Sequence, residues 1–180
     1  MTKYSFQNFD AKSMARIAGR NMPISTKHSV EIARYLRGKQ VDKAIKHMQA
    51  VIEQKEAIPF RRYKRSISPK PGIGQGRYPR LASQYILALL ENLKSQAISK
   101  GLDATKLTII HAAAQKGQKL WHYGRRRRQR KNTNFEMVAK EVEQKKKEEK
   151  PVSSPASKMQ PRKGQEERQT GGTTGSRGSV

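Results

Sequence analysis

The sequence predicts an α+β fold, in which three helices precede two strands joined by an unusually long basic connection. Apolar residues recur at helical spacing in three segments between residues 25 and 101, and two later stretches have the composition of strands. From residue 144 onward Lys, Glu, Ser, Pro, Gln and Gly dominate, and aromatic residues are missing. We therefore predict one domain over residues 1–143 and a disordered charged tail over residues 144–180.

An edge strand is expected near the N-terminus. Residues 11–24 mix small, basic and apolar side chains without helical periodicity. Gly19 and Pro23 disfavour a central strand, so any strand here should lie at the edge of a sheet. Strand alternation would place five side chains on one face: Met14, Arg16, Ala18, Arg20 and Met22.

Two short helices should follow almost without a gap. Either Ser25 or Thr26 can cap the first helix, and Gly38 ends it. Apolar residues at helical spacing over residues 41–52 predict the second helix, which should end before Pro59.

The third helix should be the longest, and a hairpin should follow it. Pro79 suits the first position of this helix, a wide apolar stripe follows, and Gly101 ends it. Residues 107–114 and 135–142 are expected to form strands. If these strands continue into the connection over residues 115–134, about nine or ten residues on each side would reach roughly 30 Å, at about 3.3 Å per residue.

The net charge limits the classes of partner. The chain has 39 Lys and Arg residues against 14 acidic residues, a formal charge of +25. A compact domain with this charge repels itself unless a polyanion neutralises it, so nucleic acid is the expected partner and a membrane surface is the rival. The chain has no cysteine, no apolar run that could span a bilayer and no apolar stretch typical of a signal peptide. We therefore expect a soluble cytoplasmic protein.

Two segments without any acidic residue, residues 60–80 and 115–134, hold 15 of the 39 cations. The first is rich in Pro and Gly, which should prevent regular structure. Aromatic residues accompany the cations in both segments, and such rings stack on unpaired bases while arginine binds phosphate in a forked geometry. A charge run is often only a solvated surface, but that reading suits runs with interspersed acids. The candidate RNA-binding residues are Arg16, Arg20, Lys27, Arg61, Arg62, Tyr63, Lys64, Arg65, Lys70, Arg77, Tyr78, Arg80, Lys116, Lys119, Trp121, Tyr123, Arg125, Arg126, Arg127, Arg128, Arg130 and Lys131.

Nothing in the sequence indicates an active site. His28, His47, His111 and His122 do not have the spacing of a metal site. The glycines of residues 72–76 lack the preceding strand and the spacing of a phosphate-binding loop. No Ser–His–Asp set or pair of carboxylates stands out among so few acids. We expect no enzymatic activity, no metal and no cofactor.

Six short stretches carry a family resemblance, and their order and spacing make the set specific. They are Gly19-Arg20-Asn21, Ser25-Thr26-Lys27-His28, Ile58-Pro59-Phe60-Arg61-Arg62-Tyr63, Gly76-Arg77-Tyr78-Pro79, Leu89-Leu90-Glu91-Asn92 and Ile109-Ile110-His111-Ala112-Ala113. Over about residues 4–143 the chain resembles the archaeal and eukaryotic branch of the universal ribosomal protein L-twenty-two family of the large subunit.

The resemblance implies three helices packed on a small antiparallel sheet, with a long protruding basic hairpin at about residues 107–142. It implies a structural constituent of the large ribosomal subunit that binds large-subunit ribosomal RNA and supports assembly, while its hairpin lines the polypeptide exit tunnel. The implied partners are that RNA, neighbouring large-subunit proteins, including the one sharing the tunnel constriction, and the nascent polypeptide. At the hairpin tip the chain departs from the family pattern of small residues between cations, because Trp121-His122-Tyr123-Gly124 leads into four consecutive arginines.

Three other readings explain less of the sequence. A nucleoid-type DNA-binding protein would account for the charge, but not for a long basic hairpin together with a separate basic loop. An RNA-modifying enzyme would need a pocket with perturbed groups or a cofactor loop. A membrane-surface protein would carry its cations opposite an apolar helix face, whereas here they concentrate in loops.

Overall fold

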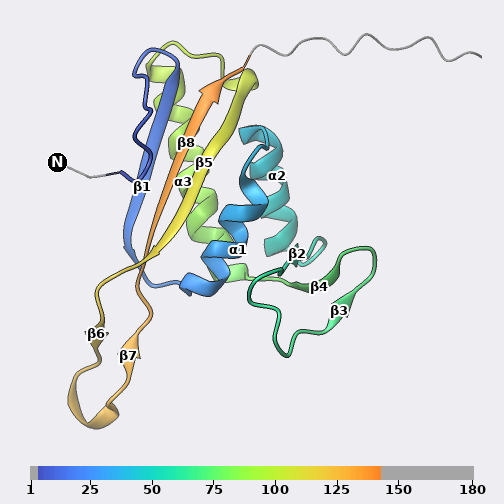
Figure 1. The fold of residues 1–180 in the computed structure, drawn as a ribbon, viewed down its shortest axis with the longest axis vertical. Helices are drawn as coiled ribbons and strands as arrows, with labels where there is room; N and C mark the ends of the chain where they lie inside the picture. Colours follow the sequence, from blue (N-terminus) through green and yellow to red (C-terminus); the bar gives the residue numbers. More distant parts are fainter. Residues whose placement is uncertain (1–3, 143–180) are drawn as a thin grey trace, which may run out of the picture. The chain divides into compact units, whose positions relative to one another are not determined.

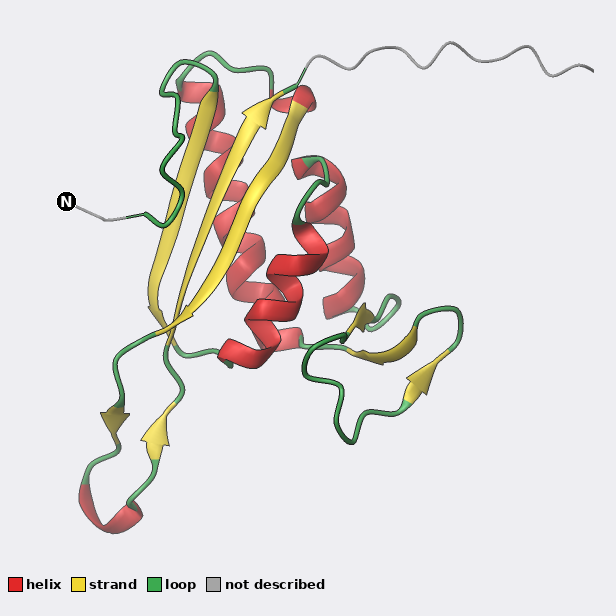
Figure 2. Cartoon of the chain, viewed as in Figure 1, coloured by secondary structure: helices red, strands yellow, loops and turns green. Residues whose placement is uncertain are grey.

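Three helices pack on one face of a three-stranded antiparallel sheet (Figures 1 and 2). The computed structural model describes residues 4–142, so the predicted tail, residues 144–180, lies outside the described residues. The sheet has the order β1-β8-β5. Its strands and the three helices have these bounds: β1 Met14–Met22, α1 Thr26–Leu36, α2 Val41–Ile52, α3 Arg80–Ser99, β5 Leu107–Lys116 and β8 Thr133–Glu141. The predicted α+β class and the predicted packing of helices on the sheet are confirmed.

The hydrophobic core fills the space between the sheet and the helices. Helix α3 packs against β1, α1 packs against β5, and α2 packs mainly on α3. Both the helices and the sheet contribute large buried side chains, among them Ile32, Leu36, Met48, Ile86, Leu90, Leu93, Ile109, Phe135 and Met137. Within residues 4–142, no helix is long and apolar enough to cross a membrane.

Strand β1 lies at the edge of the sheet, as predicted, but its alternation is interrupted. Arg16 and Arg20 are exposed on one face, whereas Met22, predicted on that same face, is buried in the core. The register against β8 shifts between Gly19 and Met22, and Asn21 adopts a left-handed backbone with φ 54°. This bulge turns Met22 inward. Gly19 lets α3 approach closely, because an added Cβ would lie 2.8 Å from Leu89 Cδ1.

The predicted helices are confirmed, but their predicted caps differ in detail. Ser25 stands at the N-cap of α1 without a capping side-chain hydrogen bond, and its carbonyl accepts one from Ser29 Oγ at 3.0 Å. Pro79 is the N-cap of α3 and not its first helical residue. Gly38 takes a left-handed conformation with φ 78°, and its N–H donates to the Ile109 carbonyl at 2.8 Å. This bond ties the α1–α2 turn to β5.

The basic loop between α2 and α3 contains regular structure, contrary to the prediction. Three short strands, β2 Ile58–Pro59, β3 Pro69–Lys70 and β4 Gly74–Arg77, form a small sheet in the order β2-β4-β3. The two strand prolines occupy outer strands, where one missing N–H is tolerated, and the central strand has none. Proline and glycine therefore limit these strands to a few residues but do not abolish them.

The β5–β8 hairpin continues beyond the main sheet as a narrow ribbon (Figure 1). Strands β6 Leu120–Trp121 and β7 Gln129–Arg130 pair with each other, and a short 3-10 turn, Gly124–Arg126, forms the tip. Another 3-10 turn, Ala104–Lys106, precedes β5. At the junction the Gly117 N–H donates to the Asn132 carbonyl at 3.0 Å. The predicted protruding hairpin is confirmed.

We predict that the tail can be removed without loss of stability, because α1, α2, α3 and the sheet enclose a continuous core within residues 4–142. We expect a chain truncated after Glu143 to unfold within about 2 °C of the full chain, since 1 kcal/mol corresponds to about 2–8 °C for a domain in this size range. Thermal unfolding followed by circular dichroism checks this. A decrease of more than about 5 °C would place part of the folding unit in residues 144–180.

Candidate nucleic-acid interface

Three distant parts of the chain meet at the base of the hairpin. The start of α1, the basic loop and the hairpin ribbon lie at the same end of the domain (Figure 1). A hollow of about 560 Å³ is lined by residues 25–27, by Tyr63, and by residues 116–119 and 129–132. We call it the hairpin-base hollow. Its lining contains five cations and no acid: Lys27, Lys116, Lys119, Arg130 and Lys131.

Tyr63 provides a ring surface inside this hollow. The ring is partly buried against the core, and the Lys27 ammonium lies 5.9 Å from its centroid. The Arg62 guanidinium lies 5.6 Å from the same centroid. A partly exposed ring flanked by cations can stack on an unpaired base while the cations neutralise adjacent phosphates. The arrangement therefore suits single-stranded or looped nucleic acid.

His28 reports the positive field of this region. Its ring packs edge-on against Phe60, with the centroids 5.5 Å apart. Burial lowers the pKa of His28, and the charges of Arg77 from the basic loop and Lys131 from the hairpin lower this pKa further. One side chain of α1 therefore feels cations from both basic segments.

This field predicts a pH-dependent affinity. In the free protein the lowered pKa keeps His28 neutral to a lower pH than an ordinary histidine, so its contribution to stability is lost as pH falls below about 6.5. A bound polyanion offsets Arg77 and Lys131 and raises the pKa, so binding takes up a proton. We expect RNA affinity to increase more between pH 7.5 and 5.5 in the unaltered chain than in His28→Gln, because only the unaltered chain takes up this proton on binding.

Titrations at several pH values, at fixed ionic strength, check this expectation. His47→Gln on α2 is the matched control, because it removes a histidine that pairs with Glu56 instead. An identical pH profile in His28→Gln and the unaltered chain would contradict it.

Glu31, a residue that the sequence reasoning missed, holds the basic loop in place. It lies on α1, its side chain is buried with 1% exposure, and its carboxylate accepts three backbone N–H groups. The donors are Arg61 at 3.3 Å, Arg62 at 2.7 Å and Tyr63 at 2.9 Å. These bonds engage the backbone only, and the Arg61 and Arg62 residues are exposed. The available sequence signal was that Glu31 is the sole acid of α1.

The remaining predicted residues of the basic loop either contact other residues of the loop or are exposed. Arg77 donates to the Ser66 carbonyl at 3.4 Å, and the Lys70 ammonium lies 5.4 Å from the Tyr78 ring centroid. Lys64, Arg65 and Arg80 are exposed.

Other predicted residues lie away from the hairpin-base hollow. Arg16 and Arg20 are on the outer face of the main sheet, where the Arg16 guanidinium packs 4.7 Å from the Tyr4 ring centroid and 4.2 Å from that of Phe9. Trp121 and Tyr123 are 64% and 89% exposed near the hairpin tip, beside the exposed arginines 125–128. The candidate residues therefore form three surfaces: the hollow with the basic loop, the outer face of the sheet, and the tip. Within residues 4–142, no group of three or more His, Asp or Glu side chains could hold a metal ion.

Comparisons with a family sequence model and with individual relatives agree on one family. The sequence model of the family described as "Ribosomal protein L22p/L17e" matches residues 17–140. The chain is 43% identical over 123 residues to the "Large ribosomal subunit protein uL22" of Archaeoglobus fulgidus, covering 67% of this chain and 79% of that protein. It is 45% identical over 116 residues to the protein of the same name from Cenarchaeum symbiosum, and this match covers 63% of this chain and 76% of that protein. The protein of the same name from Aeropyrum pernix is 39% identical over 151 residues, and this match covers 77% of this chain and 97% of that protein.

Proposed function

Because the chain belongs to the ribosomal protein L22p/L17e family and is a protein of the large ribosomal subunit, we propose that it binds large-subunit ribosomal RNA through the three surfaces described above. The observation that carries this proposal is the hairpin-base hollow, where one cation of α1 and four of the hairpin lie around Tyr63 of the basic loop without an acid. Such a surface neutralises phosphates regardless of sequence.

The proposed role is structural and not catalytic. Cations on the three surfaces can each meet a different stretch of RNA backbone, and the folded domain fixes the distances between them. Tyr63 adds a stacking position for an unpaired base. A protein built in this way holds separate RNA segments together, which supports assembly of the subunit. Neighbouring large-subunit proteins complete its surroundings.

The direct test compares ribosomal RNA with duplex DNA, because a nucleoid-type DNA-binding protein is the alternative. Fragments of large-subunit RNA and DNA duplexes of equal length are titrated with the full chain at about 150 mM salt. We expect the structured RNA to bind at least about tenfold more tightly, because looped RNA offers unpaired bases as well as phosphates. Equal affinity, or tighter binding of DNA, would favour the alternative.

We also propose that the hairpin lines the polypeptide exit tunnel. The ribbon is only two strands wide, and its tip exposes Trp121 and Tyr123 beside four arginines. A narrow ribbon can enter a confined space, and this set of side chains suits stacking and phosphate contact at an RNA wall. The nascent polypeptide and the protein that shares the constriction are the partners proposed for the tip.

Deleting residues 121–128 should therefore leave docking intact and change tunnel function. The deletion spares Lys116, Lys119, Arg130 and Lys131 of the hairpin-base hollow. We expect subunits to contain the shortened protein in normal amounts while ribosomes pause differently on nascent chains with charged segments, because the tip charge acts on them by Coulomb forces. Mass spectrometry of purified subunits and ribosome profiling provide the two measurements. Loss of the protein from subunits would instead make the tip an anchor.

A further inference from the structure

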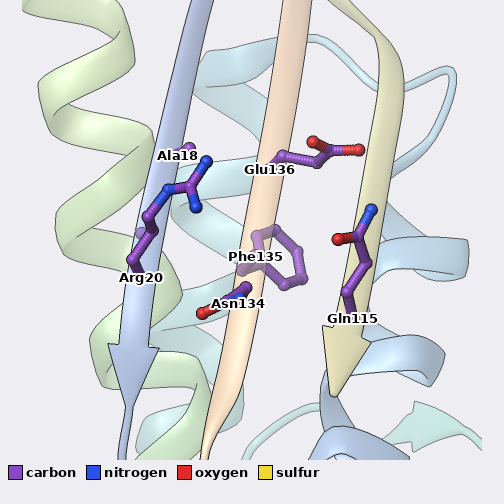
Figure 3. Close-up of a pocket in the computed structure, with 7 residues that line it drawn as sticks. Ala18, Arg20, Gln115, Asn134, Phe135 and Glu136 are labelled. Atoms are coloured by element: carbon purple, nitrogen blue, oxygen red, sulfur yellow. The ribbon is translucent and has the colours of Figure 1, made fainter. Parts of the chain in front are cut away.

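A second hollow, of about 420 Å³, lies on the outer face of the main sheet (Figure 3). We call it the outer-face hollow. All three strands line it: Ala18, Gly19 and Arg20 from β1, Asn134, Phe135 and Glu136 from β8, and Gln115 from β5. Figure 3 shows the polar side chains of Arg20, Asn134, Glu136 and Gln115 around one stretch of the sheet. Four side chains with different hydrogen-bonding roles therefore surround one space.

Strand register explains why these side chains meet. Ala18 pairs with Glu136, and Gln115 pairs with Asn134. Because side chains alternate between the faces of a sheet, the intervening Phe135 points into the core while its two neighbours point outward. Ala18 is small and leaves room between the arginine and the carboxylate.

Glu136 is an acidic residue on one of the three surfaces proposed to face RNA. It is also buried, with only 7% exposure. The Ser5 backbone N–H donates to its Oε1 at 3.3 Å and its Oε2 at 3.1 Å, the Ser5 hydroxyl bonds to Oε1, and His111 Nε2 lies 3.2 Å from Oε1. These contacts concentrate on Oε1. Each carboxylate oxygen has about two acceptor positions, so Oε1 is fully engaged, while Oε2, which accepts the Ser5 N–H, can accept one further donor.

This chemistry selects a base over a phosphate. A buried carboxylate repels phosphate, whereas it accepts hydrogen bonds from the exposed edge of an unpaired base. Guanine carries two adjacent N–H donors on one edge, one of which can donate to Glu136 Oε2, and the O6 and N7 acceptors on another edge, which match arginine. We propose that the outer-face hollow binds an unpaired guanine of ribosomal RNA, with Glu136 and Arg20 reading its two edges and Gln115 and Asn134 completing the set. This inference rests on the proposed RNA-binding function and adds a base preference to it.

The test uses three RNA octamers: eight uridines, and the same octamer with one central guanosine or one central adenosine. Both purines stack similarly on Tyr63, so their difference isolates edge recognition. We expect the full chain to bind the guanosine octamer at least about fivefold more tightly than the adenosine octamer, in line with the discrimination of a two-point base contact. In Glu136→Gln the preference should fall below about twofold while octauridine binds no more weakly.

Two further variants separate base reading from structural effects. Asp42→Asn removes an acid on α2 that pairs with Lys94, and it should retain the preference. Gln115→Ala leaves the Ser5–Glu136 contacts in place and should still reduce the preference. The inference is overturned if the unaltered chain does not distinguish guanosine from adenosine, or if neither Glu136→Gln nor Gln115→Ala alters the distinction. Failure of RNA binding as a whole would appear separately, in the comparison of ribosomal RNA fragments with duplex DNA.

Discussion

Replacing Arg61, Arg62, Lys64 and Arg65 together with alanine should produce the largest loss of RNA affinity. The four side chains are exposed on a loop whose backbone Glu31 fixes. Each phosphate contact contributes about 0.7–0.9 to the slope of log affinity against log salt. Four lost contacts should therefore reduce that slope by roughly 3 to 4.

The measurement is a salt titration against a large-subunit RNA fragment. A matched variant replaces Lys12, Lys43, Lys46 and Lys55, four exposed cations outside the three surfaces, with alanine. It loses the same formal charge and should retain most of the slope. If the slope of log affinity against log salt falls equally in both variants, net charge alone drives binding. An unchanged slope in the first variant would show that these loop cations do not meet phosphate.

Glu31→Ala should be the most damaging single substitution for the basic loop. It removes the acceptor for three partly buried backbone N–H groups and leaves them unpaired, at a cost of about 1 kcal/mol or more each. We expect the free energy of unfolding to fall by about 3 kcal/mol or more, with RNA affinity falling as well, because the loop cations lose their fixed position. Glu31→Gln keeps one side-chain carbonyl oxygen, so its free energy of unfolding should lie between those of Glu31→Ala and the unaltered chain.

Amide hydrogen exchange and chemical denaturation together test this role. Exchange at Arg62 and Tyr63 should accelerate in Glu31→Ala but not in Glu91→Ala, which removes an exposed acid from α3. Unchanged protection at Arg62 and Tyr63 would mean that other contacts hold the loop.

The features predicted correctly from the sequence are those encoded by local patterns. Helix α3 follows from apolar residues repeated at helical spacing between Pro79 and Gly101. The edge position of β1 follows from Gly19 and Pro23, and the hairpin follows from two strand-like stretches with a long connection. The absence of acids from residues 60–80 and 115–134 also indicated, from the sequence alone, the loop and the ribbon that line the hairpin-base hollow.

The features missed depend on partners far apart in the chain. Glu31 meets its donors thirty or more residues away, which helical periodicity cannot reveal. The inward turn of Met22 depends on a bulge at Asn21 opposite β8. Similarly, the contact of Lys27 with the Tyr63 ring requires the loop to fold back on the start of α1. Sequence patterns indicate which residues are basic, and tertiary structure determines which of them share a surface.

Ultraviolet crosslinking of intact large subunits, followed by mass spectrometry of the crosslinked peptides, would identify the parts of this protein that contact ribosomal RNA. We expect RNA adducts on Tyr63 in the basic loop and on residues 116–119 or 129–132 of the hairpin, because these residues line one hollow. Peptides from the exposed surface of α2, around Lys43 and Lys46, should remain free of adducts. RNA adducts confined to the α2 surface, with none on the basic loop or the hairpin, would contradict this expectation.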